Sequence, residues 1–343
     1  MLNLAFLARI HFVKVRDVKS LHTIKLIGAY LREKGVLKQE IISIEDIYQF
    51  FIYLKQNPNS FYTLYIYNYL FHFISSDEVA KRKTSARVFE DLLANIFDAE
   101  VADNQKRSNL EFCVGDYFIN VKDKIASNRR EKADIIFANH YAFSVKTLIA
   151  KNAEINMGSF EKRVLFDGLR VDNYLSERKS SEGAGVGSKP QFLKLLKLIE
   201  TLSSYEIFVE KFNKMAEFIY DNDLLLTIKN NEKMELYFFA GSEIVALFKT
   251  MSKDKENFLS IVNRYEGNSL RIDRNALIKA CKRSALLDFS HLNHSVMNLI
   301  NQFDYKLHKS YVEYFKDKNS KNELFEDLEA LFDYFDTHFK ELN

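Results

Sequence analysis

The amino-acid sequence predicts an α/β core that lies between two mainly helical regions. Three observations lead to this prediction. Residues 84–97 have the apolar spacing of an amphipathic helix, residues 111–149 contain short segments typical of strands, and helical periodicity prevails towards both ends of the chain. We therefore expect a helical region at 1–78, an α/β core at 79–190, and a mainly helical region with one small hairpin at 191–343.

Composition and charge narrow the class of protein. The chain has 343 residues, of which 47% are hydrophobic and 28% charged, as in globular proteins. Because 49 Lys and Arg face 47 Asp and Glu, any affinity for nucleic acid depends on where the charges lie. Two distant cysteines, Cys113 and Cys281, exclude a disulfide framework and a four-thiolate zinc site and favour a reducing compartment. Arg9 and Lys14 interrupt the apolar N-terminal segment, and the sequence has no apolar run of about eighteen residues, so we expect a soluble, cytoplasmic protein without membrane contact.

The N-terminal region has the patterns of several helices. Apolar residues recur at helical spacing between residues 18 and 31. Ser43, followed by Glu45 and Asp46, resembles a helix start that leads into an apolar segment. The aromatic segment 61–73 suits a buried helix or a strand, since its period fits both, and we interpret it as a helix.

The α/β core begins with the amphipathic helix at 84–97, which Thr84 or Ser85 caps. Strands are then predicted at 111–114 with 117–121, at 132–138 and at 141–149. The last two are separated by Asn139 and His140, residues that tolerate turn geometry, so an antiparallel hairpin is expected.

The remaining chain is expected to be helical with one interruption. A helix is predicted from about Ser159, followed by a loop at 180–190 whose Gly and Ser content suggests a boundary or a mobile loop. Helical periodicity continues from Gln191. Residues 224–241 alternate between apolar and polar, with Asn230 and Asn231 at the centre, which predicts the small hairpin.

Residue types with catalytic chemistry meet in the predicted hairpin at 132–149. Asp134 begins one strand, and Lys146 lies on the paired strand, so a turn at residues 139–140 brings both side chains towards one end of the hairpin. Ser144 and Lys146 share a face because they are two residues apart, and Val145 faces the other way into apolar surroundings. Phosphodiester hydrolysis needs oxygen ligands for Mg²⁺, an activated water and positive charge near the phosphate. A carboxylate and a lysine on adjacent strands meet part of that requirement.

These residues resemble the pattern of the PD-(D/E)xK nuclease superfamily, over about residues 84–170. That pattern has a carboxylate on an opening helix, an Asp at a strand start, and Glu/Asp-x-Lys on the next strand of a mixed sheet flanked by helices. Glu90, Asp134 and Lys146 occupy these places. Two positions depart from the pattern, since Ser144 replaces the acidic residue and Ala133 replaces the usual proline.

The departure at Ser144 is similar to a Ser-x-Lys variant found among type II restriction endonucleases. In that variant a glutamate from the following helix replaces the missing acid, and Glu161 or Glu154 stands in a comparable place. The resemblance implies that Asp134, Glu161 and Glu90 hold Mg²⁺ and that Lys146 orients and deprotonates the attacking water. It also implies DNA contacts by the segment after the catalytic strand, and basic residues before that hairpin suit phosphates. The expected DNA-binding residues are Arg129, Arg130, Asn152, Asn156, Lys162 and Arg163.

The sequence thus predicts a type II restriction endonuclease that hydrolyses double-stranded DNA at a specific site with Mg²⁺. The resemblance further implies a homodimer in the cytoplasm of a prokaryote, with a companion DNA methyltransferase. Two alternatives stay open. One is a nuclease of the same superfamily without sequence specificity, acting in repair or phage defence. The other is a non-enzymatic helical interaction protein in which Asp134 and Lys146 have only structural roles.

Overall fold

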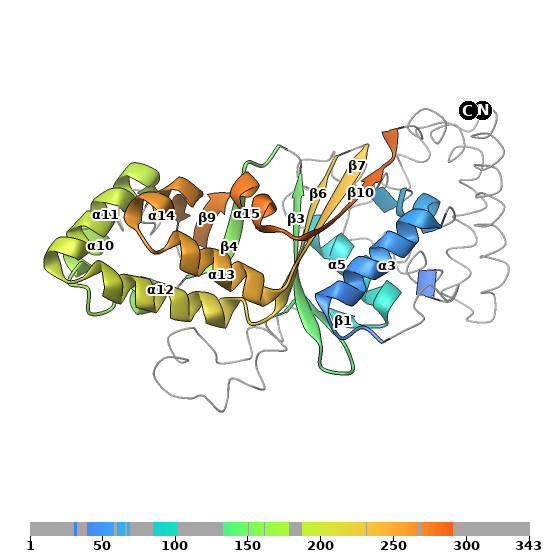
Figure 1. Cartoon of the computed structure of the whole chain (residues 1–343), viewed down its shortest axis with the longest axis horizontal. Coiled ribbons are helices and arrows are strands. Elements are labelled where there is room, and N and C mark those ends of the chain that lie inside the picture. The colour runs from blue at the N-terminus through green and yellow to red at the C-terminus, as the bar shows by residue number, and fades with distance from the viewer. Residues whose placement is uncertain are drawn as a thin grey trace.

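The structure is a computed structural model of the whole chain (Figure 1). It describes residues 31–32, 40–57, 60–65, 67–68, 85–101, 133–149, 151–160, 162–177, 187–230, 232–266 and 269–290. The predicted strands at 111–121 lie outside these ranges, as do residues 291–343 and most of the predicted helix at 18–31.

A six-stranded mixed sheet, called sheet A, is the centre of the structure, and it confirms the predicted α/β class. Its strand order is β1-β2-β3-β6-β7-β10, with β3 and β6 parallel and every other neighbouring pair antiparallel. The bounds are Glu100–Val101 for β1, Ile135–Ile136 for β2, Ala142–Ile149 for β3, Asp223–Lys229 for β6, Lys233–Phe239 for β7 and Arg283–Asp288 for β10.

A second sheet, called sheet B, has four antiparallel strands in the order β4-β9-β8-β5. The bounds are Glu154–Ser159 for β4, Gly187–Ser188 for β5, Val262–Glu266 for β8 and Ser269–Asp273 for β9. The helix predicted from about Ser159 is therefore wrong in its start, because β4 ends there and a single turn of helix follows at Lys162–Leu165. The segment after residue 241, predicted to be helical, also contributes β8, β9 and β10.

Helices cover both faces of sheet A (Figure 1). Helices α3 and α5 pack on one face, and the helices that follow β4 lie on the other side. Their bounds are Ile44–Gln56 for α3, Ser85–Phe97 for α5, Lys162–Leu165 for α9, Asp172–Glu177 for α10, Lys189–Leu202 for α11, Tyr205–Ile219 for α12, Gly241–Met251 for α13, Lys255–Ile261 for α14 and Arg274–Ala280 for α15.

Several local predictions are confirmed. Ser43 caps α3, since its side chain accepts a hydrogen bond from the Asp46 N–H. The aromatic segment is helical at residues 60–65 and 67–68. The hairpin around Asn230 is formed by β6 and β7. The division at residue 190 stays a prediction, but sheet A takes β6, β7 and β10 from beyond it.

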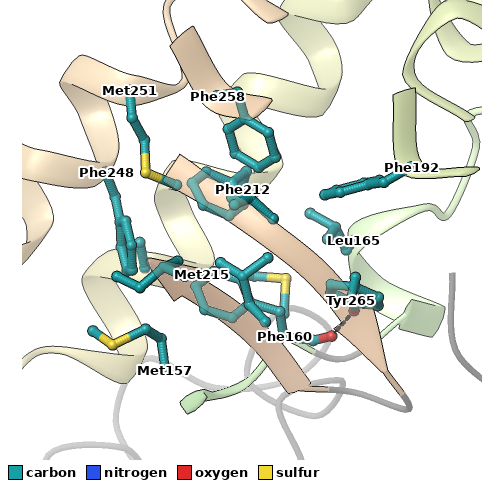
Figure 2. Packing of buried hydrophobic residues seen from close by; sticks show 14 of the residues in the cluster. Met157, Phe160, Leu165, Phe192, Phe212, Met215, Phe248, Met251, Phe258 and Tyr265 are labelled. Carbon is teal, nitrogen blue, oxygen red and sulfur yellow. Dashed lines mark hydrogen bonds between the residues drawn. The ribbon is translucent and has the colours of Figure 1, made fainter. Parts of the chain in front are cut away.

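The second face of sheet A, sheet B and helices α11 to α14 enclose an aromatic core (Figure 2). Phe212 is central, with its ring centroid 5.0 Å from those of both Phe160 and Phe258. Tyr265 of β8 is fully buried and donates its hydroxyl to the Phe160 carbonyl. Such offset and edge-to-face aromatic contacts stabilise a core beyond the area that they bury.

A lysine is buried in the core between sheet A and helix α5. Lys229 has no exposed surface, its Nζ donates to the Tyr67 hydroxyl at 2.6 Å, and the same Nζ lies 3.8 Å from the Phe89 ring centroid. The aromatic rings favour the ammonium form. Loss of hydration opposes that form more strongly, so burial holds the pKa of Lys229 well below its ordinary value.

This depressed pKa predicts a pH-dependent stability. The amine of residue 229 binds a proton more tightly in the unfolded chain than in the folded chain. The free energy of unfolding should therefore increase as the pH is raised, up to the ordinary lysine pKa of about 10.4. The slope due to this group should be at most about 1.4 kcal/mol per pH unit. Denaturant unfolding of the wild type and of Lys229→Met between neutral pH and pH 10 measures the difference. If the free energy of unfolding changes with pH by the same amount in the two proteins, the expectation is contradicted.

Candidate active site

The hairpin of β2 and β3 forms as its turn residues predict. His140 adopts a positive φ of 73°, and the Asn139 side chain accepts a hydrogen bond from the Tyr141 N–H at 3.1 Å. Across the hairpin, Ile135 pairs with Phe143, so Asp134 comes level with Ser144 on the other strand. The strand pairing therefore sets the position of Asp134 along β3.

The carboxylate of Asp134 is bonded to the backbone of β3. Its Oδ2 accepts a hydrogen bond from the Val145 N–H at 2.7 Å, and the Asp134 N–H donates to the Phe143 carbonyl at 3.1 Å. Val145 is the residue between Ser144 and Lys146, so the carboxylate lies beside both. The structure thus brings Asp134 and the Ser-x-Lys segment together at one end of the hairpin.

Alternation along β3 separates the apolar residues from the candidate site residues. Phe143 and Val145 are buried in the core beneath α3 and α5. Ser144 and Lys146 therefore point to the opposite face, in register with Leu224 and Leu226 of β6. Both side chains are partly buried. The face of Lys146 is consequently the face that leads towards sheet B.

Glu90 is placed differently from the other candidates. It lies on α5, and its side chain is only 9% exposed. Because α5 covers the Val145 side of sheet A, Glu90 belongs to the helix on the opposite face from Ser144 and Lys146.

Of the two candidates for the missing acid, Glu161 and Glu154, the structure describes only one. Glu161 lies outside the part of the chain that the structure describes. Glu154 is the first residue of β4 in sheet B, where its Oε2 accepts a hydrogen bond from the Arg264 Nε at 2.8 Å. An ion pair of this kind gives Glu154 a structural partner on another strand.

The predicted DNA-binding residues are partly described. Asn152 and Asn156 are exposed, on the segment that joins β3 to β4 and on β4 itself. Lys162 and Arg163 are the first two residues of α9. Arg129 and Arg130 lie in the part of the chain that is not described.

A residue that the sequence analysis did not single out holds the hairpin in place. Asp223, at the start of β6, accepts hydrogen bonds from the Tyr141 hydroxyl at 2.8 Å, the Ile44 N–H at 3.2 Å and the Gly241 N–H at 2.9 Å. It thereby joins the hairpin, α3 and α13. Burial, followed by the charge of Asp223, raises the pKa of Tyr141 well above its ordinary value, so the hydroxyl stays a donor. The sequence feature that could have identified Asp223 is a carboxylate at the start of an otherwise apolar strand.

Metal ligands are sparse within the described ranges. No three His, Cys, Asp or Glu side chains converge there as a group that could hold a metal ion. Mg²⁺ is commonly held by only one or two carboxylates, together with waters and substrate phosphates. The Asp134 carboxylate, beside Lys146, can serve as one of these carboxylate ligands, and Glu161 is the residue expected to supply the second.

Comparisons of the chain with protein-family models, with curated proteins and with solved structures found no match. Among the helices that the structure describes, none combines the length and apolar character needed to cross a membrane.

Proposed function

We propose that this chain is a Mg²⁺-dependent endonuclease that hydrolyses double-stranded DNA at a short specific site. The contact between the Asp134 carboxylate and the Val145 N–H, at 2.7 Å, carries this proposal. This contact keeps the Asp134 carboxylate next to the strand that carries Lys146, whose side chain is partly exposed. A carboxylate that can hold a metal ion next to a lysine that can act on water meets two requirements of phosphodiester hydrolysis.

The order of elements supports the same assignment. An opening helix, α5, is followed by β1, then by Asp134 directly before β2, and then by Ser144 and Lys146 on β3. The sheet that contains them is mixed and has helices on both faces. The resemblance to PD-(D/E)xK nucleases implies this order and this type of sheet.

In the proposed reaction, Asp134 and Glu161 would hold the metal, whereas Glu90 is separated from Asp134 because α5 covers the opposite face of sheet A. A bound Mg²⁺ supplies Lewis-acid polarisation of the phosphate. Lys146, as the neutral amine, would orient a water for in-line attack on phosphorus and take its proton, and the departing 3′ oxygen would take a proton from solvent. The bond from phosphorus to the 3′ oxygen breaks, which leaves a 5′-phosphate and a 3′-hydroxyl. Ser144 would be a small neighbour of the site without a nucleophilic role.

Digestion of phage DNA tests the proposal. Purified protein should cut the DNA into discrete bands with Mg²⁺ and leave it intact with EDTA. A smear would favour a nuclease without sequence specificity. Intact DNA over a range of protein and Mg²⁺ concentrations would overturn the nuclease assignment and favour a non-enzymatic protein.

If the target site is palindromic, two-fold symmetry of the DNA matches a homodimer of the enzyme. A companion methyltransferase that protects host DNA, and a cytoplasmic location in a prokaryote, belong to the same proposal.

A further inference from the structure

Strand β10 is the outermost strand of sheet A, beyond β7 (Figure 1). No strand among the described residues pairs with its outer side. Directly after β10, the Phe289 N–H donates to the carbonyl of Glu232, the residue before β7, at 2.6 Å. Because successive residues of a strand turn their backbone groups to opposite sides, Ser284, Leu286 and Asp288 direct theirs outward. The edge of β10 therefore presents the backbone donors and acceptors of three residues.

Several features that protect edge strands from further pairing are missing from β10. Proteins protect such strands by making them short or by placing prolines, bulges or charges in them. β10 has six residues without a proline, and its register with β7 is regular over its whole length. Its charged residues, Arg283 and Asp288, stand only at its two ends. In contrast, the structure describes β1, at the other edge of sheet A, over two residues only. A further strand can therefore add to sheet A at β10.

An exposed leucine lies near the middle of this edge. Ala285 and Leu287 are buried in the core beneath α3 and α5, so Leu286 points to the opposite face of sheet A, where 42% of its surface is exposed. Its neighbours on that face are Ser284, which is exposed, and Asp288, which is half-buried. An apolar side chain on an open edge strand favours association with a strand of another molecule.

We propose that β10 pairs in antiparallel fashion with β10 of a second copy of this chain, about a two-fold axis through Leu286. Residues that lie directly opposite each other in an antiparallel pair point to the same face. With the axis at Leu286, this side chain lies against the partner's Leu286, and Ser284 lies opposite the partner's Asp288. The contact thus buries the exposed leucine of each copy and satisfies the outward backbone groups of both strands.

The charges along this edge are complementary to those of a second copy. In the proposed register Lys282 is the diagonal neighbour of the partner's Asp288, so one pair of opposite charges forms on each side of the axis. Lys282 already pairs with Glu243 at 3.3 Å and Asp288 with Lys233 at 3.4 Å, yet 74% of the Lys282 side chain and 42% of the Asp288 side chain are exposed. Ion pairs at such exposed positions contribute little, so they do not prevent contact with a new partner.

The proposed pairing also sets the direction of the two candidate active sites. A two-fold axis perpendicular to sheet A keeps each face of the sheet on the same side in both copies. Ser144 and Lys146 point to the face opposite α3 and α5, as Leu286 does. The dimer would therefore present this face of both copies in one direction, as two sites that act on one DNA duplex require. Only this consequence rests on the proposed function, and the pairing itself does not.

Sedimentation of the purified chain over a range of concentrations measures the association. The wild type should be in equilibrium between one and two copies, because two short strands form a small interface and a two-fold contact closes at two copies. Leu286→Arg should raise the Kd of the dimer at least about tenfold, since it removes the apolar contact and sets like charges opposite each other. Leu202→Arg on α11 is the matched control, because Leu202 is 39% exposed, and it should leave the Kd unchanged.

Cross-linking tests the register. Opposite residues whose backbone groups bond each other lie about 5.5 Å apart between Cα atoms, which suits a disulfide. Leu286→Cys should therefore form a disulfide-linked dimer on oxidation. Ser284→Cys should not, because in the proposed register it lies opposite the partner's Asp288. The wild type, which contains Cys113 and Cys281, gives the background of cross-linking.

Thermal unfolding of each variant identifies any that fails to fold, and the cysteine variants keep the test valid if Leu286→Arg does. A wild type that stays monomeric at the highest concentration measured would overturn the pairing, as would a Leu286→Arg dimer as strong as that of the wild type. Failure of Leu286→Cys to cross-link above the background would overturn the register. DNA cleavage by a monomer would leave the nuclease proposal standing, whereas a dimer through β10 that does not cut DNA would do the reverse.

Discussion

Lys146→Ala should remove DNA cleavage by at least about 10²-fold while the protein stays folded and still binds DNA. Lys146 lies on the partly exposed face of β3, in register with Leu226, and the apolar residues that secure β3 to α3 and α5 point the other way. Truncation of this side chain therefore leaves the core beneath β3 intact. The loss should be specific to catalysis, because a lysine that deprotonates water or stabilises phosphate charge acts in the transition state.

Cleavage rates with Mg²⁺, DNA binding in EDTA and thermal unfolding together measure this expectation. Lys194→Ala on α11, which removes an exposed lysine far along the chain from β3, serves as the control and should cut like the wild type. Full activity of Lys146→Ala would exclude Lys146 from the mechanism. A large loss of thermal stability would instead assign Lys146 a structural role.

Asp134→Asn should abolish Mg²⁺-dependent cleavage, again by at least about 10²-fold. The amide oxygen of asparagine can still accept the hydrogen bond from the Val145 N–H, which the carboxylate accepts at 2.7 Å in the wild type. The substitution therefore removes the negative charge with little change to the hairpin. Asp134→Ala removes both the charge and the acceptor, and it should also lower the free energy of unfolding by about 1–3 kcal/mol.

Cleavage assayed over a series of Mg²⁺ concentrations separates these two roles of Asp134. Equal Mg²⁺ dependence of Asp134→Asn and the wild type would show that Asp134 is not a metal ligand. If both variants cut normally and only Asp134→Ala is less stable, the Asp134 carboxylate has only a structural role at β3, and the metal ligands lie elsewhere in the chain.

Much of the local structure could be predicted because it depends on short stretches of sequence. The cap at Ser43, the amphipathic pattern of α5 and the turns at Asn139 and Asn230 each act within a few residues. The approach of Asp134 to the Ser-x-Lys segment followed from the same local logic. A hairpin with a short turn fixes its own register, and alternation then decides which residues share a face.

Sheet B could not be predicted, since its strands come from residues 154–159, 187–188 and 262–273. No local period specifies which distant strands pair, and because β4 follows β3 closely, the sequence predicts only the approach to a helix at this point. The same limit applies to Glu90, because helical periodicity identified its helix but not the face of sheet A that the helix covers.

The sequence by itself determined the α/β class, the β2–β3 hairpin and the neighbouring positions of Asp134 and Lys146, because turn chemistry and side-chain alternation operate over short distances. Only the tertiary structure decided that Asn156 lies beside Arg271, which pairs in turn with Arg264, both more than a hundred residues further along the chain. Pairing between distant strands depends on how their buried faces pack in a common core, here the aromatic core beneath sheet B.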